Sequence, residues 1–290
     1  MTAYNLHDRY FDPVTGHISS YFCQLFILIG QDYFQYCLLD TEKNKFIALA
    51  DFRLPSVAKT PGLIYSQIEG LIAEEELLRK KYPSVVIGID TPHHTLVPAP
   101  LYDKDQVSKY LEFNFRIPEN CHYLADRLNE VDAYNVCGLP EKLIEILTGY
   151  FTKAAFVHAS TAVLKATYHF HKVNPGPANL FLMVRGNFID LVMFEGSRPV
   201  LFNSFPCLSK EDLLYYTLFV IENSSLRPDH VRLCLGGMID EDSDTYRLLA
   251  QYIGNLSFCG RLSTFNYSGI LGQMPAQRYQ DLFALALCGS

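Results

Sequence analysis

The side chains most able to do chemistry in this sequence are histidines, cysteines and clustered acids. His93-His94 follows an apolar run, and His169 and His171 end a helical pattern, so either pair could supply metal ligands. On a strand, however, neighbouring histidines face apart, and a pair two positions apart presents only one face. A metal site would need further ligands that the sequence does not single out. We therefore expect these histidines to lie on the surface or in a lobe.

The sequence gives less support to nucleophilic catalysis than to a metal site. Cys121 and His122 are adjacent, but adjacency does not align a thiolate with its base, and no G-x-S-x-G motif occurs. The acids of 240–244 could hold a hard cation, although their spacing is not that of a calcium loop. A charged helix N-terminus explains them better. The sequence therefore predicts neither catalytic residues nor metal ligands.

Eight cysteines are spread singly along the chain, mostly inside apolar runs. They are Cys23, Cys37, Cys121, Cys137, Cys207, Cys234, Cys259 and Cys288. No C-x-x-C motif or paired spacing occurs, which argues against a zinc site and a disulfide framework. We expect reduced residues of the core.

Composition limits the classes of partner. The chain has 290 residues, of which 49% are hydrophobic, enough for one large or two medium domains with sizeable cores. Its net charge of −7 gives no basis for binding phosphate backbones, so we expect no nucleic acid partner. The N-terminal residues lack the basic and apolar segments of a signal peptide, and no apolar run approaches the ~20 residues that cross a bilayer. We expect a cytoplasmic protein that meets a membrane only through a partner.

The elements of the first half form the order βββαβ. Residues 21–54 read as three strands joined by tight turns, Pro61-Gly62 opens an amphipathic helix that extends to about 82, and 85–90 is a short strand. Residues 91–131 have the pattern of short helices and an extended piece rather than of sheet strands, which predicts an inserted subdomain. The chain then continues with a strand at 132–138, a helix after Pro140, a strand at 154–160 and a bridging helix at 160–172. We expect Met1–His17 to form either a loosely docked arm or an added edge strand.

The second half repeats this order. Asn174-Pro175-Gly176-Pro177 is the clearest hinge signal. Three strands follow within 179–205, then a helix at 209–225 capped by Ser209, a strand at 230–237, a helix from Ser243-Asp244, a short strand and a final helix after Pro275. The predicted fold class is α/β, with an N-terminal lobe at 1–157 and a C-terminal lobe at 158–290 around an interlobe cleft.

This duplicated βββαβα order resembles the ribonuclease H-like fold of the actin, Hsp70 and sugar-kinase superfamily. The closer likeness is to bacterial pilus-assembly and cell-division actin-like proteins, and it covers most of the chain. The matching stretches are DAYNVCGLPEKLIEILTGYFTKAAFVHASTAVLKA (132–166), NLFLMVRGNFIDLVMFEGSRPVLFNSFP (179–206), VRLCLGGMIDED (231–242) and MPAQRYQDLFALALCG (274–289). The resemblance implies an uncharacterised bacterial family of this fold.

The resemblance also implies a nucleotide site with two phosphate loops, each built on Asp-x-Gly. Here the loops read Leu28-Ile29-Gly30 and Val184-Arg185-Gly186, so both metal-binding aspartates are replaced. Since Mg²⁺ is held largely by carboxylates and phosphates, this loss implies a pseudo-ATPase. The residues that the family would place at a nucleotide are Gly30, Gln31, Gly186, Asn187, Gly236 and Gly237. They are equally explained as turns, with Gly30 and Gly186 supplying a positive φ.

Three functions remain open. The leading hypothesis is a non-catalytic scaffold that binds a protein partner. The second is a switch that binds ATP or ADP without turnover and closes about 174–177. The third is a divergent ATPase or small-molecule kinase that recruits Asp32, Asp90 or Asp190. The aromatic residues of 102–123 form either the small core of the inserted lobe, which we favour, or a protein-binding patch.

Overall fold

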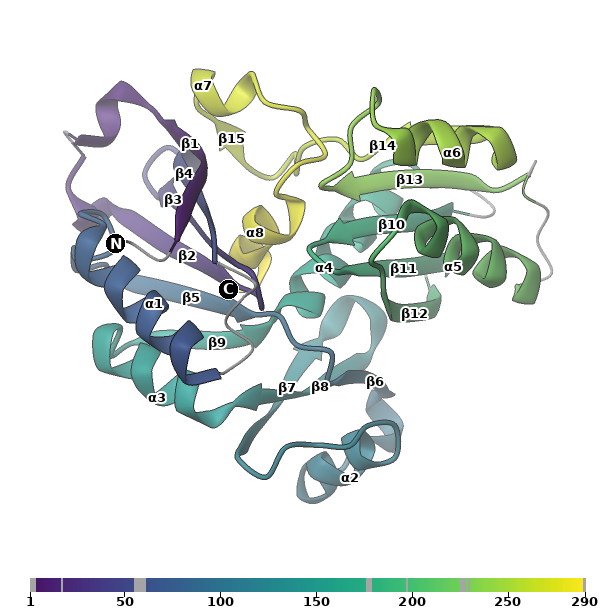
Figure 1. Ribbon diagram of the computed structural model, residues 1–290, viewed down its shortest axis with the longest axis horizontal. Coiled ribbons are helices and arrows are strands. Elements are labelled where there is room, and N and C mark those ends of the chain that lie inside the picture. Colours follow the sequence, from purple (N-terminus) through teal and green to yellow (C-terminus); the bar gives the residue numbers. More distant parts are fainter. Residues whose placement is uncertain are drawn as a thin grey trace.

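Two lobes lie side by side, with a third, smaller sheet below them (Figure 1). The computed structural model describes residues 4–16, 18–54, 61–175, 179–196, 198–224, 228 and 230–288. Half of the predicted hinge at 174–177 lies outside these residues, because 176 and 177 are not described.

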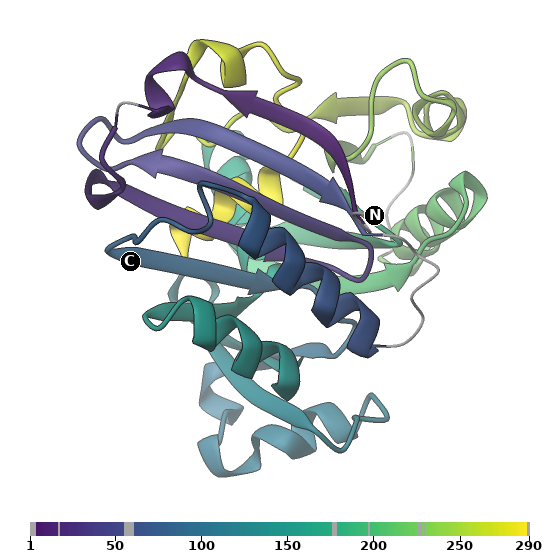
Figure 2. The ribbon, with the colours of Figure 1, turned by 60° about the vertical axis from the view of Figure 1, so that its left-hand side comes forward.

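The first sheet has the order β1-β4-β3-β2-β5-β9, and β15 pairs with β4. Its strands are β1 (Asn5–Phe11), β2 (Cys23–Ile29), β3 (Tyr33–Asp40), β4 (Lys45–Arg53), β5 (Ser84–Ile89), β9 (Ala154–His158) and β15 (Asn266–Tyr267). The helices α1 (Pro61–Glu74) and α3 (Glu141–Tyr150) cover its outer face (Figure 2). With its inner face also covered, β2 and β5 are apolar almost throughout.

The second sheet has the order β12-β11-β10-β13-β14. Its strands are β10 (Asn179–Arg185), β11 (Phe188–Glu195), β12 (Arg198–Pro206), β13 (Arg232–Gly237) and β14 (Asn255–Phe258), covered by α5 (Lys210–Asn223) and α6 (Asp244–Tyr252). In each sheet three antiparallel strands are followed by two parallel ones, so β4-β3-β2-β5-β9 and β12-β11-β10-β13-β14 correspond strand for strand. The predicted duplicated fold is confirmed.

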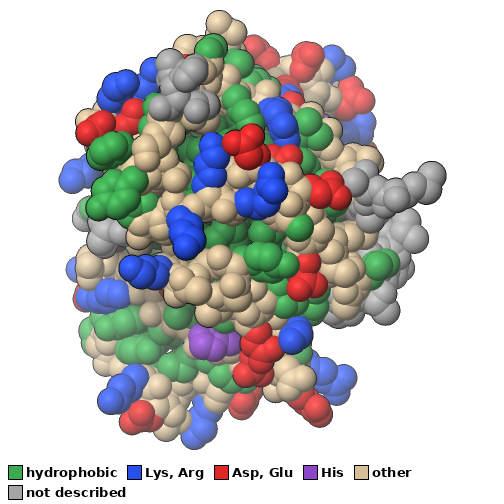
Figure 3. Space-filling view, turned by 90° about the vertical axis from the view of Figure 1, so that its left-hand side faces the viewer, with side chains coloured by type: hydrophobic (Ala, Val, Ile, Leu, Met, Phe, Trp, Pro, Cys, Tyr) green, Lys and Arg blue, Asp and Glu red, His purple; other side chains and the backbone are tan. Residues whose placement is uncertain are grey.

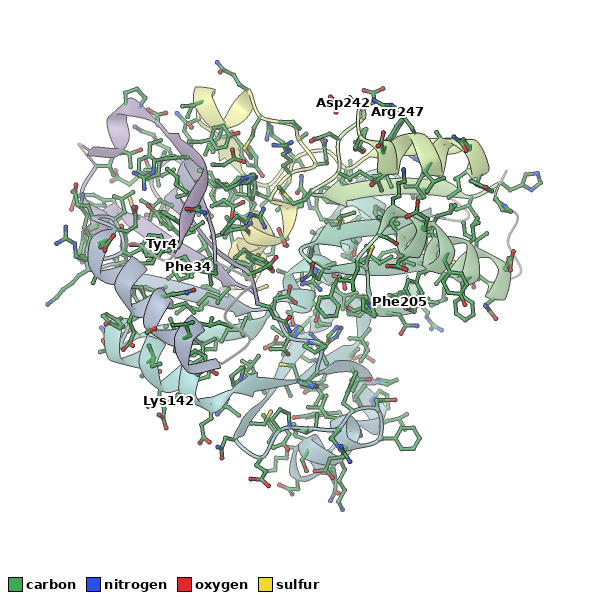
Figure 4. The ribbon with its side chains drawn as sticks, in the orientation of Figure 1. Tyr4, Phe34, Lys142, Phe205, Asp242 and Arg247 are labelled. Atoms are coloured by element: carbon green, nitrogen blue, oxygen red, sulfur yellow. The ribbon has the colours of Figure 1, made fainter. Side chains whose placement is uncertain are left out.

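Local signals in the second lobe act as predicted. Ser209 forms a capping box with Asp212 at the start of α5, and Ser243 accepts a hydrogen bond from the Tyr246 amide at the start of α6. Phe205 of β12 stacks on Tyr216 of α5 with ring centres 4.5 Å apart, which fixes the helix on the sheet (Figure 4).

The space between the sheets holds α4 (Ala159–Val173) and α8 (Gln280–Ala284). α4 contacts strands of both sheets, as its position between the halves predicts. The end of the chain then returns to the first lobe, where β15 pairs with β4 and α7 (Gly269–Gly272) packs on β1 and β4. The division at 157/158 remains a prediction, with 266–288 lying largely against the first sheet.

The inserted region has a sheet of its own, in the order β6-β8-β7. It comprises β6 (His94–Pro98), β7 (Cys121–Leu128) and β8 (Ala133–Pro140), with α2 (Val107–Glu112) packed on it. The sheet thus continues past the predicted limit of about 131. Most of the aromatic residues of this region, among them Tyr102, Tyr110 and Phe115, pack on its small core, while Phe113 is 89% exposed.

Residues 5–11 form β1 at the edge of the first sheet, the second of the two predicted alternatives. Two other predicted elements differ from the structure. α1 ends at Glu74, and Glu75 turns inward to accept hydrogen bonds from Tyr36 (2.8 Å) and Arg9. The final helix is reduced to α8, because Tyr279 has φ +58° and breaks the helical path before it.

One result bears on the membrane. Within the described part of the chain, no helix combines the length and the apolar character that crossing a bilayer requires.

Replacement of Gly237 by alanine should destabilise the protein strongly. Gly237 has φ +83°, and a Cβ there would lie 2.1 Å from the carbonyl oxygen of Val184, a backbone atom of the neighbouring strand. We expect Gly237→Ala to lower the free energy of unfolding by about 3 kcal/mol or more, measured by urea denaturation. Gly254→Ala is the control, since a Cβ at Gly254 meets nothing within 4 Å. Equal stability of the two variants would contradict this account.

Candidate functional site

The two turns that correspond to the phosphate loops face each other across the lobes. Gly186 has φ +47°, and a Cβ there would lie 3.3 Å from a carboxylate oxygen of Asp32 in the turn of the first lobe. Gly30 does not have a positive φ, so the prediction that its turn requires glycine for a positive φ is wrong. The ring of Tyr33 packs directly on Gly30, where a Cβ would be 2.2 Å from it.

A buried arginine occupies the region between these turns. The side chain of Arg185, 2% exposed, lies with Nη1 2.6 Å from Asp90 Oδ1 and Nε 2.6 Å from Asp190 Oδ2. Its Nη2 also donates to Asp190 Oδ1 at 3.0 Å, so this pair is bidentate. Asp90 follows β5 of the first lobe and Asp190 lies on β11 of the second. One guanidinium therefore joins the lobes through two carboxylates.

Burial and the neighbouring charges together shift the pKa values of Arg185 and Asp281. Burial alone would lower the pKa of Arg185, but Asp190 and Asp90 raise it well above its ordinary value. Asp281 of α8 and Arg185 line one narrow crevice. Burial raises the pKa of Asp281 to about 6, while the positive charge of Arg185 opposes this shift. The guanidinium is thus permanently charged, whereas Asp281 titrates near neutral pH.

Polar side chains extend the cluster into both lobes. Tyr33 donates to Asp90 at 2.7 Å, and Ser204 of β12 donates to Asp190. His94 Nε2 lies 2.8 Å from the Ser204 hydroxyl oxygen, and its ring centre is 4.7 Å from that of His158. The sequence placed His94 on the surface or in a lobe, but it is buried at the interlobe contact.

Both histidines are neutral. Burial lowers the pKa of His94 to about 4 and that of His158 well below its ordinary value. His158 Nε2 lies 2.9 Å from the Thr91 carbonyl, which can only accept, and its Nδ1 accepts from the Ser160 amide. Nε2 therefore carries the proton. His158 was missed in the sequence because it lies alone in an apolar run with no neighbouring ligand type.

The predicted nucleotide residues divide between two spaces. Gly30, Gln31 and Asn187 line a pocket of about 690 Å³, whereas Gly186 and Gly237 line a crevice of about 10 Å³ closed by Tyr33 and Tyr279 among others. The crevice has room for about one water molecule. A Cβ on Gly236 would lie 2.4 Å from the sulfur of Met183, so this glycine serves packing within the second sheet. Nucleotide binding by the six residues remains a prediction.

The larger pocket lies between the first sheet and the inserted lobe. It is bounded by the ends of β2 and β5, by α1 and the start of α3, and by β7 and β8 of the third sheet. Apolar side chains dominate its lining, among them Ile64, Ile68, Leu139 and Leu143. Its polar lining residues include Asp32, Asp90 and Asn187. On the face of the molecule that Figure 3 shows, hydrophobic side chains lie between scattered charged groups. A pocket of this size and character suits an apolar ligand or segment.

The other predicted sites are not assembled by the fold. His169 contacts Ser263, and His171 packs on Phe194 of the second sheet, so the two side chains have separate partners. The 240–244 acids surround the start of α6, where Asp240 pairs with Arg278. Within the described residues, the one cluster with metal-ligand spacing is His7, Asp8 and Asp51, whose two carboxylates already accept hydrogen bonds from Tyr279.

Solved structures with the same architecture show the fold. A Bacteroides thetaiotaomicron protein, described as having an actin-like ATPase fold and unknown function, is 20% identical with a TM-score of 0.76, over 93% of this chain and 97% of that one. A chain of a PilM–PilN type IV pilus biogenesis complex is 15% identical with a TM-score of 0.63, over 92% and 98%. The ethanolamine utilization protein EutJ from Carboxydothermus hydrogenoformans is 9% identical with a TM-score of 0.50, over 92% and 90%.

These comparisons define the fold and the family. No curated protein matches the sequence. The solved structures share the two-lobed actin-like ATPase fold, as the resemblance implied. The family described as "Protein of unknown function (DUF3822)" matches residues 15–256, most of the sequence. The chain therefore belongs to the DUF3822 family and has an actin-like ATPase fold.

Proposed function

We propose that this protein is a catalytically inactive actin-like protein that acts by binding another protein in the cytoplasm. The observation that carries the proposal is the Arg185 guanidinium between Asp90 and Asp190. Arginine does not deprotonate in proteins, so its positive charge is permanent. A divalent cation would have to displace this charge before it could use either carboxylate. The cluster thus supports a structural role for the groups that would otherwise suit catalysis.

The alternative of a divergent ATPase or kinase required Asp32, Asp90 and Asp190 to converge. Asp90 and Asp190 do approach the same point between the lobes, but both pair with Arg185. Asp32 is partly exposed and lines the larger pocket. This arrangement supports an ion-paired contact better than a metal site, so the enzymatic alternative is the weaker one.

A nucleotide switch has less support than protein binding. The crevice beside Gly186 and Gly237 is about 10 Å³, whereas ligand pockets usually measure about 300–1,000 Å³. Gly237 instead permits a close approach to Val184, whose carbonyl accepts from the Met238 amide at 3.0 Å. The glycine pair therefore has a structural role that accounts for it without an adenosine.

The pocket of about 690 Å³ is the place we propose for the partner. Its apolar lining suits the hydrophobic side chains of a protein segment, and its polar lining residues, among them Asp32 and Asn187, are groups that can hydrogen-bond a backbone. The likeness to a chain of the PilM–PilN complex supports a protein partner, since that fold there forms a protein complex. We propose no nucleic acid partner.

We expect no Mg²⁺-dependent ATP hydrolysis by the purified protein above the buffer rate. Both carboxylates between the lobes are ion-paired with Arg185, so a Mg²⁺ ion, which in-line phosphoryl transfer requires, would have to displace the guanidinium to bind them. Release of phosphate from ATP is the measurement. Turnover by the wild type that Asp90→Asn abolishes would overturn the proposed inactivity, because a contaminating ATPase would not respond to this change.

A charge placed in the pocket should abolish partner binding. Ile64 lines the pocket, whereas Leu63, the preceding residue of α1, is exposed outside it. Quantitative affinity capture should show a loss of about tenfold or more in retained partner for Ile64→Asp, while Leu63→Asp keeps the wild-type level. Cross-linking should place the captured protein against α1 and β8.

Both variants need the same melting profile as the wild type for this comparison. If Ile64→Asp is folded and still retains the partner, the pocket is not the docking site.

The Asp281 carboxyl should make stability depend on pH. Its folded pKa, raised to about 6, exceeds the ordinary value of 3.8, so its contribution to stability is complete below about pH 4 and is lost as pH rises through about 6. Asp281→Asn removes this loss. Relative to the wild type, the variant should gain on the order of 2 kcal/mol in free energy of unfolding between about pH 4 and pH 7.5.

Urea denaturation across this range measures the gain. Asp242→Asn, an exposed acid at the start of α6, is the control. A gain for Asp281→Asn that does not change with pH would show that burial does not shift this carboxyl.

A further inference from the structure

Two cysteines far apart in the sequence meet on the inner face of the second sheet. Cys234 lies on β13 and Cys259 follows β14, 25 positions later, yet their Sγ atoms are 2.9 Å apart. The register explains this contact. β13 and β14 are parallel with Cys234 opposite Ser257, and Cys259 lies two positions beyond Ser257 on the same face. The sheet itself therefore positions the two thiols.

This pair borders a cavity. A space of about 110 Å³ is lined by Cys234 and Cys259, by His169 and Phe170 of α4, and by the cationic side chains of Arg232 and Arg261. Cys234 is partly exposed, whereas Cys259 is only 2% exposed. Since about 10–15 Å³ is enough for one water-sized molecule, the cavity can admit a small reagent to Cys234.

The two thiols are not equivalent. The Cys259 thiol donates a hydrogen bond that lowers the pKa of Cys234; burial opposes the shift, while the Ser257 hydroxyl and the Arg232 guanidinium assist it. Burial raises the pKa of Cys259 well above its ordinary value, and the neighbouring Cys234 adds to this. The partly exposed Cys234 is thus the more nucleophilic thiol of the pair, and the buried Cys259 lies behind it.

The other cysteines of the chain lack this combination. Cys37 and Cys137 are buried, and burial raises their pKa well above the ordinary value. Cys207 is partly exposed, but burial and Asp212 raise the pKa of its thiol. Within the described residues, Cys234 is the cysteine that combines partial exposure, a lowered pKa and a second thiol in contact.

We propose that Cys234 and Cys259 form a dithiol site that reduces a small hydroperoxide and closes reversibly into a disulfide. The Cys234 thiolate attacks the terminal peroxide oxygen, the O–O bond breaks, and the leaving oxygen takes up a proton. The product is a sulfenic acid on Cys234 and one molecule of water or alcohol. The site is independent of the proposed partner pocket.

Cys259 then completes the reaction. Its sulfur attacks Cys234 Sγ, the S–O bond breaks, and the hydroxide leaves with the Cys259 proton as water. In total two thiols are oxidised by two electrons and the peroxide is reduced by two. The sulfur atoms need to approach from 2.9 Å to a disulfide bond of about 2.05 Å, a movement of roughly 1 Å. Such a disulfide suits a reducing compartment as a transient state rather than a staple.

Peroxide treatment of the reduced full-length chain tests the proposal. With hydrogen peroxide as the probe, non-reducing peptide mapping should find Cys234 cross-linked to Cys259, with a mass loss of two hydrogen atoms that dithiothreitol reverses. Alkylation at neutral pH should label Cys234 about tenfold faster than Cys207, the matched control. Cys207→Ser should keep the cross-link.

The single variants separate the two roles. Cys259→Ser should stop at a sulfenic acid on Cys234 that a dimedone probe captures, and Cys234→Ser should leave Cys259 unreacted. The proposal is overturned if both cysteines of the wild type stay alkylatable after peroxide treatment, or if Cys234 reacts no faster than Cys207. These two measurements use the wild-type chain, so they decide the question even where a variant fails to fold.

Discussion

The contact between the lobes depends on one buried charge, the guanidinium of Arg185. Arg185 is the last residue of β10, and it pairs with Asp90 of the first lobe and Asp190 of its own sheet. Removing one partner from such a buried pair typically costs about 3–5 kcal/mol, because an uncompensated charge remains. The ion pairs of Arg185 therefore stabilise the arrangement of the two lobes in which both carboxylates reach the guanidinium. Tyr33 donates a hydrogen bond to Asp90 and Ser204 donates one to Asp190, so each carboxylate has a hydroxyl partner besides the arginine.

This interaction also determines which surfaces remain for function. The space between the turns is taken up by Arg185 and by the Tyr33 ring, so the crevice next to Gly186 and Gly237 is nearly closed. The open volume lies instead between the first sheet, α1 and the inserted lobe. Asp90 connects the two places, since it pairs with Arg185 and also lines the pocket. Asp90 therefore belongs both to the pocket lining and to the contact between the lobes.

Much of the fold was predictable from local patterns. The two three-strand meanders, the capped helix at Ser209 and the duplicated order follow from apolar periodicity, turn residues and caps, which act over a few positions. The limits of α1 and the final helix were not predictable. Glu75 leaves the helical path for Tyr36 and Arg9, and Tyr279 adopts a positive φ where its hydroxyl meets Asp8 and Asp51. In both cases distant partners outweigh local helical preference.

The candidate sites, like the fold, have features that follow from the sequence and others that depend on the tertiary structure. By itself the sequence determined that the apolar residues Leu28 and Val184 stand two positions before Gly30 and Gly186, because residue identity needs no coordinates. Only the tertiary structure decided that Arg185 would meet Asp90, that His94 would be buried, and that Cys234 would touch Cys259. The physical reason is that the contact between the ends of β5 and β10 depends on the packing of the two lobes, and the contact of Cys234 with Cys259 on the register of β13 and β14. Spacing along the chain encodes neither.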